Sequence, residues 1–268
     1  MSFSAILISF LTFGSFYRFG SSNVYPEDKD LSIMTYNSRD FGFAGRKNSE
    51  LTGHKIVNFI TEQDPDIICF QESSRIGLGQ LKNYPFKYIT PYTSQKSIQA
   101  IFSKYPIVGN GSLEFPDTAN NAIYADIKYK GDTIRIYNLH LQSFKIIPGR
   151  VKSVARGIRA YSKMEKTFIK QEEQAQIFDR HRKESPFSTI VCADFNNTPF
   201  SNVYRIAKGE MQDTFDEKGI GFGKTFDLKV VPFRIDFILA DKTMQVMTHQ
   251  NFDLKLSDHY PVLTSIRL

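Results

Sequence analysis

A chain of 268 residues with 41% hydrophobic and 23% charged residues has the composition of a soluble globular protein, which excludes a largely disordered or fibrous chain. Its length suits one large domain or two small ones with a substantial core. The 34 basic and 28 acidic residues give a net charge of +6, a mild preference for acidic partners that many proteins share.

The chain begins with an apolar segment, residues 1–20, followed by a polar linker, residues 21–30. The apolar part is shorter than the roughly 20 residues that span a bilayer, and it lacks the basic start and the cleavage site of a signal peptide. A signal peptide, an N-terminal membrane anchor and the end of a longer membrane segment all stay open. We expect membrane attachment, with secretion as the alternative. Arg18 and Lys29 weakly favour a cytoplasmic position for the remaining chain, and the side of the membrane stays open.

Globular sequence starts at Leu31 with LSIMTYN, a run typical of a strand. Apolar residues at helical spacing predict a helix over residues 50–63, which Asp64-Pro65 ends. The run DIICF that follows indicates a strand buried on both faces. We expect a hairpin turn at residues 130–132. Further strands are predicted at residues 98–102, 122–129, 133–139, 189–193, 234–239 and 261–266.

Residues 150–183 form the longest helical stretch of the sequence. Its apolar residues are expected to form one stripe toward the core; they are Val151, Val154, Ile158, Tyr161 and Phe168. Its opposite face is basic, and we favour a solvated surface over a contact with a polyanion. Strands interspersed with helices indicate an α/β (α+β) layered domain over residues 31–268. The cysteines Cys69 and Cys192 lie in apolar runs and are expected to be buried free thiols, in preference to a disulfide or a metal site.

Several apolar strand-like runs end in a polar residue that can bind a metal or move a proton. These residues are Asn37, Glu72, His140, Asp194 with Asn196, and Asp258 with His259. Each alone has a structural explanation, such as a turn, a helix cap or a satisfied core histidine. Asp236 differs, because a carboxylate between Ile235 and Phe237 needs a partner or a metal. Strand ends converge at one rim of a sheet, so the set as a whole predicts a single site.

The ordered motifs TYN, CFQE, NLHLQS, ADFNNTP, RIDFIL and SDHYPV resemble those of the endonuclease/exonuclease/phosphatase superfamily. That group contains deoxyribonuclease I, abasic-site endonucleases, neutral sphingomyelinases and inositol polyphosphate 5-phosphatases. The resemblance spans residues 31–268 and is most specific in ADFN and SDHYP. It implies a four-layer α/β/β/α sandwich, in which two packed mixed sheets are flanked by helices. It also implies dependence on Mg²⁺ or Mn²⁺ and hydrolysis of a phosphate ester.

The expected metal ligands are oxygen donors, which hard divalent cations prefer. Glu72 is the best candidate, and Asn37 and Asp258 are expected to complete the coordination directly or through water. Whether one or two metal ions act stays open.

The expected catalytic roles follow the chemistry of phosphoryl transfer and agree with the resemblance. His259 is the candidate general base, and Asp236 would hold its tautomer and stabilise the imidazolium. Asp194 and Asn196 would position the nucleophile and donate to a phosphoryl oxygen. His140 would contact the phosphate, with protonation of the leaving oxygen as a further role.

Two departures separate the sequence from abasic-site endonucleases, which carry an acidic residue where this chain has Arg39 and a tyrosine where it has His140. Arg39 lies beside the predicted site. It is expected either to bind a substrate phosphate or to form a structural salt bridge.

Three functions are compatible with the sequence. The apolar N-terminus favours a membrane-associated phosphoesterase acting on a lipid headgroup or a small phosphoester. The net charge and the basic helix favour a non-specific nuclease acting on DNA or RNA, for which Tyr84, Phe86, Tyr88 and Tyr92 are possible stacking residues. An inactive binding module is the alternative of another class, and the intact set of site residues argues against it. We expect a monomer.

Overall fold

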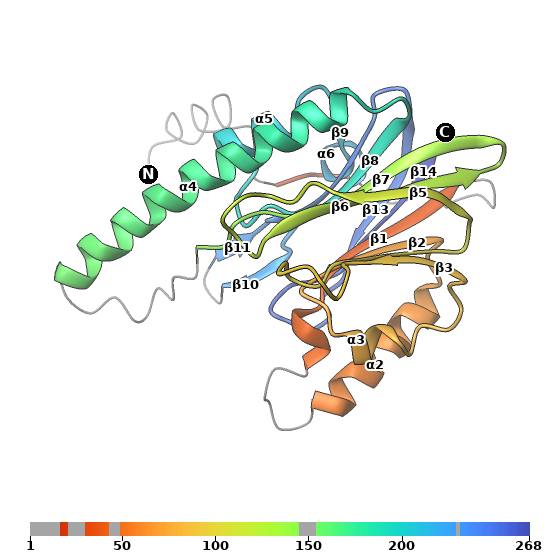
Figure 1. The fold of residues 1–268 in the computed structure, drawn as a ribbon, viewed down its shortest axis with the longest axis horizontal. Helices are drawn as coiled ribbons and strands as arrows, with labels where there is room; N and C mark the ends of the chain where they lie inside the picture. The colour runs from red at the N-terminus through yellow and green to blue at the C-terminus, as the bar shows by residue number, and fades with distance from the viewer. Residues whose placement is uncertain (1–16, 21–29, 43–48, 145–153, 229–230) are drawn as a thin grey trace.

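The computed structural model describes residues 17–20, 30–42, 49–144, 154–228 and 231–268. Two six-stranded sheets pack face to face, and helices cover the outer face of each (Figure 1). The predicted four-layer α/β/β/α sandwich is therefore confirmed.

The first sheet has the strand order β13-β14-β1-β2-β4-β3. Its central strands β1 and β2 are parallel, and β14 runs antiparallel to β1. The sheet is thus mixed, with the C-terminal ends of β1 and β2 and the start of β14 at the same edge. Its strands are β1 (Leu31–Asn37), β2 (Ile67–Gln71), β3 (Phe86–Ile89), β4 (Ala100–Ser103), β13 (Gln245–Asn251) and β14 (Val262–Arg267).

The second sheet has the order β5-β6-β7-β8-β12-β9, with β7 parallel to β8 and β12 antiparallel to β8. The predicted hairpin joins β6 to β7, and Lys130 and Gly131 both have the positive φ values that a tight hairpin turn requires. Its strands are β5 (Ile107–Ser112), β6 (Asn121–Tyr129), β7 (Asp132–His140), β8 (Ser188–Asp194), β9 (Gln212–Asp213) and β12 (Asp236–Ala240). A small separate hairpin consists of β10 (Phe226–Leu228) and β11 (Val231–Phe233).

Side chains along each central strand alternate between the core that separates the two sheets and the layer under the outer helices. Ile33 on β1 and Ile190 on β8 belong to the core between the sheets, whereas their neighbours Met34 and Val191 pack under the outer helices. Because successive side chains of a strand point to opposite faces, both faces of each central strand are buried. This explains why runs such as IICF read as continuously apolar.

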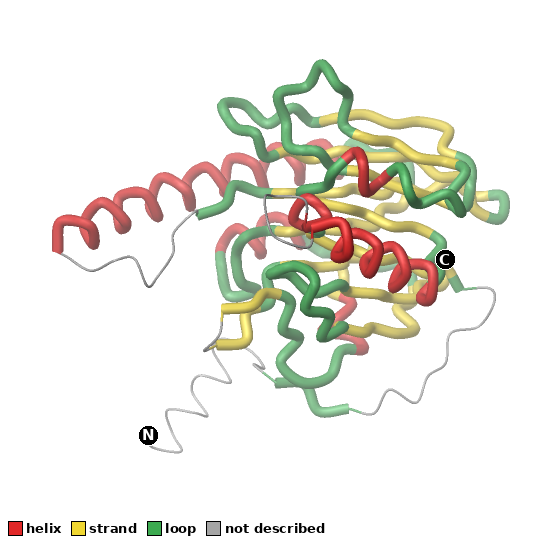
Figure 2. Tube along the Cα trace, turned by 90° about the horizontal axis from the view of Figure 1, so that it is seen from below, coloured by secondary structure: helices red, strands yellow, loops and turns green. Residues whose placement is uncertain are grey.

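The outer face of the first sheet is covered by α2 (Ser49–Gln63), which confirms the predicted helix and lies in front of the strands in Figure 2. The short helices α3 (Arg75–Leu78) and η1 (Arg39–Gly42) lie on the same side. The second sheet carries α4 (Val154–Lys183) and α5 (Asn202–Lys208). Helix α6 (Thr214–Lys218) contacts β12 and β13.

The predicted apolar stripe of the long helix is wrong where the structure describes its side chains. Tyr161 is 73% exposed and Phe168 39% exposed, and the first half of α4 extends past the sheets (Figure 1). The buried face instead carries Thr167, Gln171 and Phe178 with their neighbours. Residues 151–153 and the side chains at 154–160 lie outside the described part.

Within the described residues, Cys69 and Cys192 are buried free thiols, as predicted. Residues 1–16 and 21–29, which hold most of the predicted anchor and linker, lie outside the described residues. Tyr17 and Arg18 are described, and Arg18 pairs with Gly221 of the folded domain. No helix in the described part is long and apolar enough to cross a bilayer.

Candidate active site

Three of the predicted residues come from neighbouring strands of the second sheet. His140 ends β7, Asp194 ends β8 and Asp236 begins β12, and the register places His140 opposite Asp194 and Asp194 opposite Asp236. Residues opposite one another on neighbouring strands share a face of the sheet. Strand pairing therefore brings these three side chains together.

The first sheet supplies the other half of the site. Asn37 ends β1, Glu72 directly follows β2, and Asp258 and His259 lie just before β14. The two halves are joined by a buried hydrogen bond, in which Asn37 Nδ2 donates to Asp194 Oδ2 at 2.8 Å. The structure thus uses the Asn37 amide to connect the sheets.

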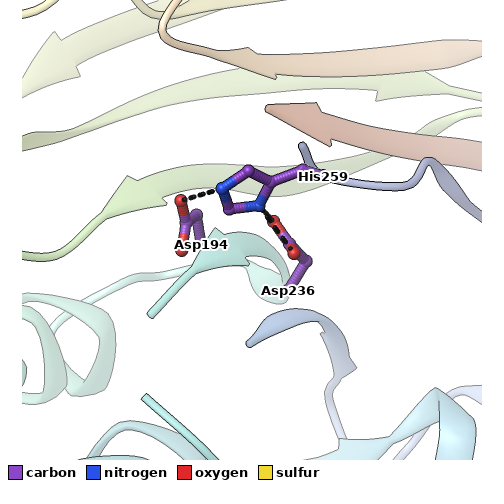
Figure 3. A group of neighbouring side chains, drawn as sticks. All are labelled: Asp194, Asp236 and His259. Carbon is purple, nitrogen blue, oxygen red and sulfur yellow. Dashed lines mark hydrogen bonds and ion pairs between the residues drawn. The ribbon is translucent and has the colours of Figure 1, made fainter. Parts of the chain in front are cut away.

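His259 lies between two buried carboxylates (Figure 3). Its Nδ1 is 3.0 and 3.1 Å from the two Asp236 oxygens, and its Nε2 is 3.8 Å from Asp194 Oδ2. Burial alone would lower the pKa of His259, but the charges of Asp236 and Asp194 outweigh it and raise this pKa to about 10. Asp236 holds one ring nitrogen, which leaves the other directed at Asp194.

Asp194 is fully buried, and its Oδ2 lies near Asn37, His140 and His259. Its Oδ1 accepts a hydrogen bond from the Asn196 backbone N–H at 2.8 Å. Burial raises the pKa of Asp194 to about 6, against the opposing charges of His259 and His140. The predicted alternative of a helix cap is wrong, because Ser201 caps α5.

His140 is 3% exposed, and neither of its ring nitrogens has a hydrogen-bond partner within the described residues. Its Nε2 lies 3.4 Å from Glu72 Oε1 and 3.7 Å from Asp194 Oδ2. A buried imidazole without a hydrogen bond is costly unless it serves a ligand. Asn196, in a left-handed conformation, donates its amide to the Leu141 carbonyl at 3.0 Å.

Arg39 forms a salt bridge with Asp258. Both side chains are partly exposed, at 43% and 31%. Of the two expectations for Arg39, the structure shows the salt bridge. The Asp258 carboxylate is therefore paired with the Arg39 guanidinium.

The sequence interpretation missed Asp40. Arg39, Asp40 and Phe41 all have left-handed backbone conformations, with φ of 42°, 61° and 54°, and the Asp40 N–H donates to the Glu72 carbonyl. Burial and the charge of Glu72 raise the pKa of Asp40. The sequence feature that could have pointed to Asp40 is its acidic side chain directly after Arg39.

The donors near Glu72 fit a hard divalent cation. Glu72 is 42% exposed at the mouth of the site, and its charge acts on the carboxyl of Asp40. Two neighbouring carboxylates repel one another, and a divalent cation relieves that repulsion. Oxygen donors facing solvent suit Mg²⁺ or Mn²⁺, which retain several waters.

A second group, Asp194, Asp236 and His259, has donor atoms within 4.8 Å of one another. We favour the Glu72 side for the cation, because Asp236 and His259 already satisfy each other and a metal between them would break that hydrogen bond.

Comparison with known proteins agrees with this architecture. Humanized TDP2 of D. rerio with 14 mutations superposes with a TM-score of 0.69 at 15% identity, covering 90% of this chain and 100% of that one. An endonuclease/exonuclease/phosphatase family protein from Bacteroides thetaiotaomicron gives 0.65 at 19% identity, over 90% and 98%. A mannosyl-6-phosphatase from the same organism gives 0.60 at 17% identity, over 89% and 100%. These likenesses show the fold.

Among curated proteins, none matches the chain. The model of the Endonuclease/Exonuclease/phosphatase family matches residues 34–259, from β1 to His259. This match confirms the resemblance drawn from the motifs, and the chain belongs to the endonuclease/exonuclease/phosphatase family.

Proposed function

We propose that the chain is a divalent-metal-dependent hydrolase of phosphate esters that works with Mg²⁺ or Mn²⁺. The observation that carries the proposal is the His259–Asp236 pair, directed at Asp194 and lying in one site with the open carboxylate of Glu72. A buried histidine oriented by a carboxylate is the arrangement of a general base.

In this proposal water attacks phosphorus, the ester P–O bond breaks, and His259 Nε2 takes the proton of the attacking water. The charges of Asp236 and Asp194 raise the pKa of His259, and a positive charge nearby would lower it toward the range in which the ring can accept a proton. Glu72 and Asp40 would hold a divalent cation, which would supply that charge and Lewis-acid polarisation of a phosphoryl oxygen. Asp194 orients the water, and the unpartnered ring of His140 contacts the phosphate and protonates the leaving oxygen.

The test measures hydrolysis by the purified full chain with Mg²⁺, with Mn²⁺ and with EDTA. The substrates are plasmid DNA, RNA, a lipid phosphodiester, a soluble inositol phosphate and a sugar phosphate. His259→Ala and Glu72→Gln serve as blanks. We expect turnover of at least one substrate class that EDTA abolishes. Both variants should remain folded by circular dichroism.

Turnover that persists in EDTA, or that either variant retains at the normal rate, would contradict the assignment. If no substrate is hydrolysed, a calorimetric titration of Mg²⁺ decides the metal site. Heat of binding that Glu72→Gln abolishes would support the cation position, and its absence would refute it.

A nuclease is the second candidate. It is supported by the net charge of +6 and by a similar fold in D. rerio TDP2 complexed with single strand DNA product, at a TM-score of 0.65 and 16% identity. Metal-dependent cutting of DNA or RNA, with small phosphoesters left intact, would favour it. The opposite pattern would favour a lipid or small-molecule phosphoesterase.

A further inference from the structure

Four large apolar side chains form an exposed cluster where the described chain begins. This aromatic patch consists of Tyr17, Phe19, Ile220 and Phe222, which are 38%, 91%, 41% and 53% exposed. The Tyr17 ring lies 4.8 Å from Phe19 and 4.9 Å from Phe222, between ring centroids. Phe19 is the most exposed large hydrophobic side chain in the described part of the protein. Such a cluster indicates an interaction surface, whereas a single exposed apolar residue would not.

The patch is held on the folded domain by specific contacts. Arg18 and Gly221 exchange two backbone hydrogen bonds, at 2.8 and 2.9 Å, so the two segments form a short antiparallel bridge. The Arg18 guanidinium lies 3.2 Å from Asp216 on α6. Gly221 has a φ of +80°, which a residue with a side chain rarely adopts. Residues 17–19 and 220–222 therefore present their apolar side chains as one surface.

The sequence on the N-terminal side indicates what covers this surface. Residues 1–16 contain no charged residue and are rich in Phe, Leu and Ile, and they run directly into Tyr17. A chain that enters a bilayer at this point would place Tyr17 and Phe19 at the lipid boundary. Tyrosine is enriched at that depth of a membrane, and phenylalanine is common on the apolar face of segments that lie in the interface.

The patch is also close to the active site along the chain. Beyond Phe222, Thr225 accepts the Tyr260 backbone N–H at 2.8 Å, and the Asp227 N–H donates to the Asp258 carbonyl at 2.8 Å. The Phe226 ring lies 4.9 Å from the His259 ring. The loop that carries half of the patch thus continues into the strand beside the candidate base.

We propose that the aromatic patch rests in the interfacial region of a lipid bilayer, which holds the neighbouring active site near the membrane surface. Apolar burial is the driving force, because the charges flanking the patch are balanced. The basic residues are Arg18, Lys218 and Lys224, and the acidic ones are Asp216, Glu217 and Asp227. Vesicles without anionic lipid are therefore expected to suffice.

The chain contains no tryptophan, so one introduced tryptophan reports on a single position. The full chain carrying Phe222→Trp is mixed with phosphatidylcholine vesicles, and Phe19→Trp is measured in parallel. Val108→Trp is the matched control, at a residue 62% exposed on β5. We expect the emission of Trp at 222 and 19 to shift to shorter wavelength and to be quenched by lipids brominated on their acyl chains. Neither effect is expected at 108.

The proposal is overturned if the emission of Trp at 222 and 19 keeps the wavelength of the vesicle-free protein and is not quenched. This holds even if the chain binds vesicles through residues 1–16. Emission already shifted without vesicles also overturns it, because the patch would then be covered by this chain or a second copy. The measurement involves no catalysis, so it stands apart from the test of hydrolysis.

Discussion

Asp236 acts on the proposed reaction through His259, since its two oxygens contact His259 Nδ1 and its side chain is almost fully buried. An amide at this position fits the same space but can hold the imidazole in the wrong tautomer. We expect Asp236→Asn to lower kcat by about 10⁴-fold, and to lower the unfolding midpoint as well, because the buried His259 loses its charged partner. Steady-state kinetics at saturating metal, with urea unfolding alongside, checks both. A kcat within a few-fold of the parent would remove Asp236 from the mechanism.

The Asp40 backbone N–H donates to the Glu72 carbonyl, and the carboxylates of these two residues are proposed to share a cation. We expect Asp40→Asn to raise the metal concentration for half-maximal activity by on the order of tenfold, with a smaller effect on kcat. Metal titrations of activity and by calorimetry measure the change. The exposed Asp117→Asn is the matched control. Equal metal affinity in the two variants would remove Asp40 from the metal site.

The site could be predicted from sequence wherever a polar residue ends an apolar strand. The positions of His140, Asp194 and Asp236 follow from strand pairing, which alternation in the sequence encodes. The position of Asp40 could not be predicted in this way, because three consecutive residues with left-handed backbone conformations turn the chain after β1. Side-chain bulk normally disfavours that conformation, and local sequence gives no sign that tertiary contacts enforce it.

At the level of elements, α6 and β13 meet at a partly buried histidine. His249 Nδ1 lies 2.8 Å from Thr214 Oγ1, and its Nε2 lies 3.1 Å from Asn251 Oδ1. Burial lowers the pKa of His249 to about 4, although the charge of Asp213 opposes the shift. The folded protein therefore resists protonation here. Its stabilisation by the neutral ring is complete above the ordinary histidine pKa and is lost as the pH falls toward the folded value.

This depressed pKa predicts a pH-dependent stability. Between pH 7 and pH 5 the unfolded chain gains a proton at His249 that the folded chain does not, which costs about 1–2 kcal/mol of the free energy of unfolding. We therefore expect the free energy of unfolding of His249→Gln to fall less than that of the parent between pH 7 and pH 5, by about 1–2 kcal/mol. Urea unfolding at both pH values measures the difference, with the exposed His54→Gln as the control for loss of an imidazole. Identical pH dependence in the parent and His249→Gln would contradict the assignment.

Helix α4 shows where periodicity fails as a guide to packing. Tyr161 and Phe168 repeat at seven, yet both are exposed, while Gln171 and Gln174 are fully buried. These glutamines bind the Gln142 backbone: Gln171 Nε2 donates to its carbonyl at 2.7 Å, and Gln174 Oε1 accepts its N–H at 2.8 Å. The helix thus meets polar backbone after β7, and a polar buried face cannot be recognised by hydrophobic spacing.

At the scale of the whole molecule, the sandwich depends on how its two sheets are held together, and the interface is not purely apolar. Asn138 on β7 donates its Nδ2 to the Phe70 and Ala100 carbonyls of the first sheet, at 2.8 and 3.0 Å. Its Oδ1 accepts from Gln71 Nε2 at 2.8 Å, and Gln99 Nε2 donates to the Asn138 carbonyl at 2.9 Å. All of these side chains are fully buried. Hydrogen bonds across a low-dielectric core fix the register of the two sheets more narrowly than apolar packing does.

Gln71 directly precedes Glu72, and Asn138 is two residues before His140, so this network lies behind both halves of the site. Asn138→Leu keeps the volume but removes the Oδ1 that accepts from the buried Gln71 amide and the Nδ2 that donates to the Phe70 and Ala100 carbonyls. We expect a loss of roughly 2–5 kcal/mol in the free energy of unfolding, together with lower kcat in the fraction that remains folded. Urea unfolding and active-site-normalised kinetics measure the two effects, and Asn110→Leu at an exposed position of β5 is the control. If only stability falls and kcat is unchanged, the network holds the sheets together without setting the geometry of Glu72 and His140.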